Sequence, residues 1–247
     1  MTPDTTVCLL NWKRPDNLPI VVEAVASQRP SPTIYLWNNG APIVQPGVDW
    51  YVASSINRRC WPRWYMAAFA PTEFVCVLDD DLCFADPHVL RDMKELLLDS
   101  GQPNTIVGPC GVTLIDGLSY RAARHVHPFR GEWKDAACDI VKGRCMLLRR
   151  HDLVTRVALA QYADEPDDDI IVSAALASGR RGQHICAASL GKRFHLLPES
   201  HALKDEAEHW TRRGKCCNKH FGTASPSNEP THACANASPT SGDMRIT

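Results

Sequence analysis

Residues 73–81 read Glu-Phe-Val-Cys-Val-Leu-Asp-Asp-Asp. Such an uninterrupted apolar run is typical of a strand that is buried on both faces of a parallel sheet. Three adjacent carboxylates at its end repel one another, so they are costly there without a cation. Ligands of open α/β sheets bind beyond the carboxyl ends of the strands, and a hard cation such as Mn²⁺ or Mg²⁺ takes oxygen ligands and bridges to phosphates. We therefore interpret Asp79, Asp80 and Asp81 as a metal–diphosphate site; the alternative is a solvated acidic turn that caps the next helix.

The segments around this strand predict a parallel sheet with helices between its strands. The chain opens with an apolar strand at 6–11, a helix at 18–27 that Asp16 or Asn17 can cap, and a second apolar strand at 33–37. Strand, helix and strand in this order indicate a βαβ unit. The other elements expected in this half are strands at 50–52 and 105–108 and helices at 62–70 and 87–100.

The second half predicts a smaller, more mixed sheet and two further helices. Strands are expected at 111–115, 119–123 and 140–148, and helices at 166–178 and 205–220. From Thr223 onward the chain consists mainly of Ser, Pro, Thr, Asn and Ala. Such a composition buries too little apolar surface to offset its ordering entropy. We expect one folded domain at 1–222 and a disordered tail at 223–247.

Composition excludes several classes of protein. Hydrophobic residues make up 44% of the 247 residues, which allows a sizeable core, and the formal net charge is -1, so no broad basic field exists to hold nucleic acid. No apolar run approaches the length of a membrane span, and the first residues lack the pattern of a signal peptide. The 11 cysteines are scattered and form no C-x-x-C pair. We expect a cytoplasmic protein with reduced thiols, in which the vicinal pair Cys216 and Cys217 packs in a helix turn.

A second acidic cluster begins the helix predicted at 166–178. It reads Asp164-Glu165-Pro166-Asp167-Asp168-Asp169. Negative charge on a first helical turn is stabilised by the helix dipole, so a capping role is one interpretation. The other is a carboxylate that faces the substrate.

Arginines and histidines supply further candidates. A forked guanidinium suits a diphosphate, and the arginines at the expected sheet edge or on the last helix are Arg14, Arg58, Arg59, Arg212 and Arg213. His195 and His201 are candidates for an additional metal ligand or for structural histidines. The sequence contains no P-loop, no G-x-G-x-x-G fingerprint and no G-x-S-x-G turn.

Taken together, the chain resembles the exostosin-like glycosyltransferases of family 64, which have the GT-A fold. The resemblance extends from about Thr6 to Phe221. It rests on the order and spacing of short blocks at 36–40 (Leu-Trp-Asn-Asn-Gly), 57–62 (Asn-Arg-Arg-Cys-Trp-Pro), 77–81 (Val-Leu-Asp-Asp-Asp), 106–108 (Ile-Val-Gly), 141–146 (Val-Lys-Gly-Arg-Cys-Met), 168–170 (Asp-Asp-Ile) and 213–219 (Arg-Gly-Lys-Cys-Cys-Asn-Lys).

The resemblance implies a fold and a set of roles. The fold would be a Rossmann-like, mostly parallel sheet flanked by helices, with the smaller sheet in the acceptor half. Asp79 to Asp81 would form the D-x-D motif, in which Asp81, with Asp79, touches the metal and Asp79 and Asp80 also contact the nucleotide sugar. Asp169 would face the reacting sugar, and Arg213 would steady the departing diphosphate. The residues that would hold the uridine are Arg14, Asn39, Asn57 and Arg59.

The sequence therefore predicts Mn²⁺-dependent (or Mg²⁺-dependent) transfer of a hexose or N-acetylhexosamine from a UDP-sugar to a glycan or other hydroxyl acceptor. The resemblance implies retention of anomeric configuration, whereas members of glycosyltransferase family 2, a close rival, usually invert. An inverting enzyme would need a carboxylate base, and Asp168 or Asp169 could serve. Nucleotidyl transfer is disfavoured because the loop at 11–16 has no glycine. A non-catalytic carbohydrate-binding protein is the remaining alternative.

Overall fold

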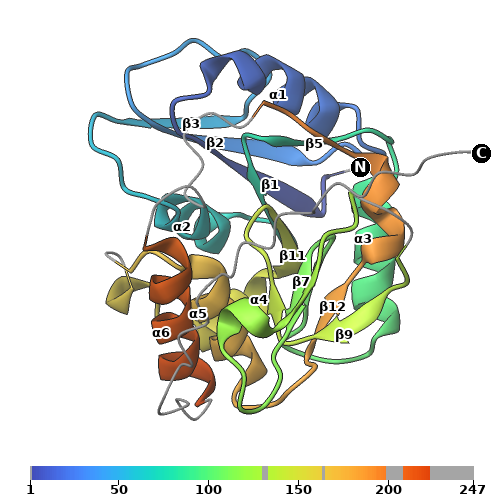
Figure 1. Cartoon of the computed structure of the whole chain (residues 1–247). Coiled ribbons are helices and arrows are strands. Elements are labelled where there is room, and N and C mark those ends of the chain that lie inside the picture. The colour runs from blue at the N-terminus through green and yellow to red at the C-terminus, as the bar shows by residue number, and fades with distance from the viewer. Residues whose placement is uncertain (1, 130–132, 163–164, 199–207, 223–247) are drawn as a thin grey trace, which may run out of the picture.

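The computed structural model describes residues 2–129, 133–162, 165–198 and 208–222. Its centre is an eight-stranded sheet with the order β3-β2-β1-β4-β11-β6-β12-β9 (Figure 1). The bounds are β1 Thr5–Asn11, β2 Thr33–Asn39, β3 Trp50–Ser54, β4 Phe74–Asp79, β6 Ile106–Gly108, β9 Ala136–Cys138, β11 Cys145–Arg149 and β12 His184–Cys186. Strands β3, β2, β1 and β4 pair in parallel, so their carboxyl ends share one edge.

Apolar residues alternate between two cores, one on each face of the sheet. Val7 and Leu9 pack against helices α1 (Leu18–Ala26) and α3 (Val89–Asp99), whereas Cys8 between them packs on the opposite face. That opposite face is covered by α2 (Trp61–Phe69), α4 (Arg150–Arg156) and α5 (Asp168–Ala177). Because both faces are covered, the central strands β1 and β4 are buried along nearly their whole length, as the apolar runs in the sequence predicted.

Two small antiparallel sheets complete the described part of the fold. One has the order β10-β7-β8 and the other pairs β13 with β5. Their bounds are β5 Leu82–Phe84, β7 Gly111–Thr113, β8 Arg124–Val126, β10 Ile140–Val141 and β13 Phe194–Leu196. Helix α6 (His209–Phe221) packs against α5 (Figure 1). Its Cys217 lies in a third core with Tyr120 and Ile170. Short 3-10 helices span Pro15–Asn17, Tyr120–Ala122, Leu159–Gln161 and Ala188–Arg193.

Three local expectations are wrong. The strand expected at 119–123 is a 3-10 helix, in which the buried Tyr120 turns its hydroxyl toward Arg213. The strand expected at 140–148 is split into β10 and β11 by a turn around Gly143. Asn17 does not cap α1; its side chain instead donates to the backbone oxygens of Asp80 (2.9 Å) and Pro198 (3.2 Å), because a 3-10 helix already precedes α1.

Other expectations fall partly beyond these residues. The tail at 223–247, His201 and the first residues of the helix expected at 205–220 lie outside the described residues; the helix itself is described from His209. The ten described cysteines are free thiols, and Cys216 and Cys217 lie on α6. Within the described residues, every helix is too short or too polar to cross a bilayer.

Candidate active site

A cleft of about 870 Å³ opens at the carboxyl ends of the parallel strands. Its walls come from the ends of β1, β2 and β4, the first turn of α2, the β10–β11 turn, the start of α5 and one side of α6. All ten site residues predicted from the sequence line it: Arg14, Asn39, Asn57, Arg59, Asp79, Asp80, Asp81, Asp168, Asp169 and Arg213. The fold thus gathers blocks from both halves of the chain in one place.

The triple aspartate turns from β4 into β5 and is held from the β1 side. Asp80 is 4% exposed; it accepts hydrogen bonds from the Trp12 backbone nitrogen (2.8 Å) and from Arg14 Nη1 (2.5 Å). Asp81 Oδ2 lies 3.3 Å from the same Arg14 nitrogen. One arginine from the loop after β1 therefore orients two of the three carboxylates.

Arg63 anchors the third carboxylate and is a residue that sequence reasoning missed. It lies on α2 with 1% of its side chain exposed. Its Nη1 pairs with Asp79 Oδ1, and its Nη2 lies 2.8 Å from Asp168 Oδ2. Trp64 Nε1 donates to the same Asp168 oxygen at 2.6 Å. The missed signal was a charged residue among the tryptophans of an otherwise apolar helix face, a pattern that indicates a buried ion pair.

Asp169 and Arg213 form a forked ion pair between α5 and α6. Arg213 Nη1 lies 3.0 Å from Asp169 Oδ1, and Nη2 lies 2.7 Å from Oδ2. Arg213 Nη2 also donates to the Tyr120 hydroxyl (2.9 Å), and its Nη1 lies 3.3 Å from Asp167 Oδ1. The Gly143 backbone nitrogen donates to Asp169 at 3.3 Å. The acidic start of α5 is therefore held by arginines. Asp167, at the N-cap position, makes no side-chain cap, whereas Asp169 accepts a hydrogen bond from the Ile170 backbone nitrogen (3.0 Å) in the first turn.

Burial and ion pairing shift the carboxylates in opposite directions. Burial raises the pKa of Asp79 and of Asp80 to about 6, against the opposing effect of the arginines beside them. Burial acts on Asp169 in the same sense, but Arg213 outweighs it and lowers the pKa of Asp169. The ionised form is therefore disfavoured at Asp79 and Asp80, where a bound cation would stabilise it. At Asp169 the ionised form is already stabilised by Arg213.

Of the four residues that the resemblance assigned to uridine, Asn39, Asn57 and Arg59 occupy the β2 side of the cleft. The fourth, Arg14, follows β1 and is paired with Asp80 and Asp81. The Asn39 amide is engaged by the 57–60 loop: it donates to the Arg59 carbonyl (2.9 Å) and accepts from the Arg58 nitrogen (3.0 Å). Asn57 accepts from the Arg59 nitrogen (2.8 Å), and Arg59 itself adopts a positive φ of 57°. Asn39 and Asn57 therefore shape the loop that presents the exposed Arg59.

The opposite wall carries aromatic and basic side chains. Lys142 Nζ lies 3.2 Å from His127 Nε2, and burial lowers the pKa of Lys142 to about 8. Trp210, on α6, lies beside Tyr120 and also lines the cleft. His195 is elsewhere: it is exposed on β13 and is not part of the cleft lining.

The donor groups of the cleft suit a hard cation that keeps some of its coordination for a ligand. Within the described residues, no three His, Cys, Asp or Glu side chains converge closely enough to enclose a metal ion. The triple aspartate does offer carboxylate oxygens at one point of the cleft. Mg²⁺-like ions bind in this manner, through one or two carboxylates together with phosphate oxygens and water. The residues therefore fit a cation that is shared with a diphosphate.

Comparison with known proteins bears on the fold. No family model and no curated protein sequence matches the chain. Among solved structures, the mannosyltransferase PcManGT from Pyrobaculum calidifontis, in complex with GDP-Man and Mn²⁺, superimposes with a TM-score of 0.52 at 14% identity over 90% of this chain. The chain has a GT-A-type glycosyltransferase fold. It spans 64% of the length of that mannosyltransferase chain. Two structures of S. aureus TarS also match, with TM-scores of 0.49 and 0.47, identities of 11% and 12%, and coverage of 75% and 71% of this chain and 57% and 34% of theirs.

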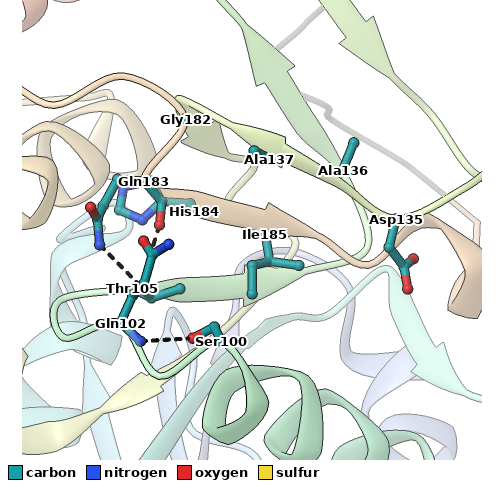
Figure 2. A pocket seen from close by; sticks show the side chains of 10 residues that line it. All are labelled: Ser100, Gln102, Thr105, Asp135, Ala136, Ala137, Gly182, Gln183, His184 and Ile185. Atoms are coloured by element: carbon teal, nitrogen blue, oxygen red, sulfur yellow. Dashed lines mark hydrogen bonds between the residues drawn. The ribbon is translucent and has the colours of Figure 1, made fainter.

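A second cavity of about 280 Å³ lies at the β12–β9 edge of the GT-A sheet (Figure 2). Its polar groups are largely satisfied by one another: Gln183 Nε2 donates to Thr105 Oγ1 (3.1 Å), and the Gln102 nitrogen donates to Ser100 Oγ (3.3 Å). His184 also lines this cavity. Its Nδ1 accepts a hydrogen bond from the Ile106 nitrogen, and its Nε2 donates one to the Ser173 carbonyl. Because the polar groups that line this cavity pair mainly with one another, we interpret it as a structural feature of the sheet edge and not as a second active site.

The buried His184 should make the stability of the fold sensitive to acid. It is 0% exposed. Burial lowers its pKa from 6.5 to about 4. Because the folded state binds this proton less readily than the unfolded state, the stability from neutral His184 is complete above about pH 6.5 and is lost as the pH falls toward 4. Over that pH range, protonation of His184 should lower the free energy of unfolding by up to about 3 kcal/mol. In His184→Gln, the free energy of unfolding measured from pH 7 to 4 should lose that part of its pH dependence. The exposed His195→Gln is the control, and parallel curves for His184→Gln and wild type would contradict the assignment.

Proposed function

We propose that the protein is a glycosyltransferase that transfers a hexose or N-acetylhexosamine from a UDP-sugar to a hydroxyl acceptor with the help of Mn²⁺. The observation that carries this proposal is that the predicted site residues come together in one cleft. Ten residues chosen from separate blocks of the sequence line one cavity at the carboxyl ends of parallel strands. That is where ligands of open α/β sheets bind. The GT-A-type fold supports the same reaction class.

The triple aspartate would hold the cation and, through it, the diphosphate. Asp81, with Asp79, would supply oxygen ligands, while Asp80 stays paired with Arg14 and the Trp12 nitrogen. A bound divalent cation would supply Lewis-acid stabilisation of the negative charge on the leaving diphosphate. The raised pKa values of Asp79 and Asp80 support this assignment, because burial without a cation disfavours their ionised form.

We assign Arg213 and Asp169 to the sugar side of the cleft. Arg213 provides a forked, permanently charged group suited to phosphate oxygens, and its present partners Asp169 and Tyr120 hold it in place. Asp169 would orient the reacting sugar or the acceptor hydroxyl. Its lowered pKa makes it a weak proton acceptor, and Asp168 is committed to Arg63 and Trp64. These pairings favour a retaining reaction, in which the departing phosphate assists the acceptor, over an inverting one that needs a carboxylate base.

A donor screen tests the proposal. UDP-sugars and GDP-sugars are incubated with the protein and Mn²⁺ and with simple glycan acceptors, and release of nucleoside diphosphate is measured. GDP-mannose is included because a structural neighbour was solved with GDP-Man. We expect release from a UDP-hexose or UDP-N-acetylhexosamine that stops when the metal is chelated. The anomeric configuration of the product, read by NMR, separates retention from inversion. Tight, metal-independent UDP binding without turnover would instead favour a non-catalytic binding protein.

A further inference from the structure

We infer that Arg63 is a buried positioning residue that holds the partly exposed Asp79 as its counter-ion, so that a divalent cation binds firmly only together with a nucleoside diphosphate. The inference deepens the proposed function and rests on it, since it concerns how the same site is loaded. It is carried by the contacts of Arg63, which the resemblance does not assign to any role.

Arg63 is a fixed charge in the floor of the cleft. Its side chain is 1% exposed, and its ion-pair partners are the carboxylates of Asp79 and Asp168. A side-chain carbon added at Gly143 would lie 2.8 Å from Arg63 Nη2, so the backbone of the β10–β11 turn closes directly over the guanidinium. Because the carboxylates of Asp79 and Asp168 and the turn at Gly143 enclose it, Arg63 holds its positive charge beside Asp79.

A cation on Asp79 must therefore share that carboxylate with Arg63. The side chain of Asp79 is 29% exposed and lines the cleft, so a cation can reach it from the open side. Arg14 imposes the same competition at the other two carboxylates: its Nη1 lies 2.5 Å from Asp80 Oδ1 and 3.3 Å from Asp81 Oδ2. Two guanidinium groups thus offset much of the negative charge that would attract a bare cation.

A diphosphate changes this balance. It brings two or more negative charges and additional oxygen ligands to the cation, so repulsion by the guanidinium groups is offset from the ligand side. The protein alone offers too few converging ligands to enclose the ion within the described residues. Cation and nucleotide are consequently expected to bind with strong positive coupling.

Asp168 sets how strongly Arg63 competes for Asp79. Its Oδ2 lies 2.8 Å from Arg63 Nη2 and 3.3 Å from Nε. The negative charge of Asp168 therefore offsets part of the positive charge that Arg63 places beside Asp79. Removal of the Arg63 charge should therefore strengthen cation binding at Asp79, and removal of the Asp168 charge should weaken it. A purely structural role of these residues would weaken cation binding in both cases.

The test is calorimetric titration of Mn²⁺ into the 247-residue chain, without nucleotide and with saturating UDP. Arg63→Gln should bind Mn²⁺ alone roughly 10- to 100-fold more tightly than wild type, because a nearby like charge is lost. Asp168→Asn should bind Mn²⁺ alone about 3- to 10-fold more weakly. The gain in Mn²⁺ affinity on adding UDP should shrink in Arg63→Gln. Arg181→Gln is the matched control: Arg181 pairs with the buried Asp139 away from the cleft, and its loss should leave Mn²⁺ binding unchanged.

Shifts in the same direction, or no shift in either variant, would overturn the role of Arg63. If Arg63→Gln does not fold, Asp168→Asn decides alone, and unchanged or tighter Mn²⁺ binding overturns it. Turnover separates this result from the proposed function. Opposite shifts in a protein that turns over no nucleotide sugar would refute the transferase and retain the loading mechanism, whereas turnover without these shifts would refute the loading mechanism only.

Discussion

Asp81→Asn is expected to reduce release of UDP from the donor by at least about 10³-fold while the protein keeps its fold. The side chain is 7% exposed and lies in the cleft beside Arg14. Asparagine has the same shape but lacks the charge that holds a hard cation. The loss of cation stabilisation at the departing diphosphate corresponds to about 4 kcal/mol in the transition state.

Stability should respond differently from turnover. Removing one of three crowded carboxylates relieves repulsion, and Arg14 retains Asp80 as a partner. The midpoint of thermal unfolding without metal is therefore expected to stay the same or to rise slightly. Asp116→Asn is the matched control, because its side chain is 96% exposed and lies outside the cleft lining. Near-normal turnover by Asp81→Asn, with Mn²⁺ still required, would remove Asp81 from the metal site.

Arg213→Gln is expected to impair both the fold and the reaction. The Arg213 side chain is 11% exposed, and its guanidinium forms a fork on the buried Asp169 while it donates to the Tyr120 hydroxyl. Its loss leaves Asp169 as an uncompensated buried charge, which typically costs about 3–5 kcal/mol of folding free energy. Turnover of the remaining folded protein should fall by about 10²-fold or more, because a preorganised charge near the leaving group is lost.

The pH dependence identifies the cause. Arg213 lowers the pKa of Asp169, so the stability from this pair is present above the unfolded pKa of 3.8 and is lost as the pH falls through the lower folded value. In Arg213→Gln the pKa of Asp169 should instead rise above 3.8, so the variant should regain part of its stability as the pH falls toward 4. Unfolding free energies of both proteins at pH 7 and pH 4 measure this convergence. A deficit of equal size at both values would contradict the role of the ion pair.

Two comparisons separate stability from turnover in this variant. The double variant Arg213→Gln/Asp169→Asn removes both charges, so it should recover much of the folding free energy at pH 7 but none of the turnover. Arg181→Gln also breaks a pair with a buried aspartate, Asp139, and should lower stability with normal turnover per folded molecule. A double variant with restored turnover would show that Arg213 acts only on the fold.

The sequence alone determined the parallel sheet and the place of the cleft. Apolar runs at β1, β2 and β4 are local patterns, and the alternation of strand and helix leaves few ways to arrange them. Polar residues that directly follow such strands must meet at one edge, so Asp79, Asp80 and Arg14 could be placed together without coordinates. The acidic start of α5 was also visible, because three successive aspartates are unusual whichever role they serve.

Only the tertiary structure decided which charges pair. Asp79 meets Arg63 across 16 positions of the chain, and Asp169 meets Arg213 across 44. In each pair the two partners lie on different elements, so nothing local marks them. The same holds for Tyr120, which lies in a segment with strand-like composition but folds as a 3-10 turn because its ring packs into the third core and its hydroxyl meets Arg213. Local patterns depend on backbone geometry and burial, which neighbouring residues share; ion pairs depend on packing between distant elements, which only the complete fold brings together.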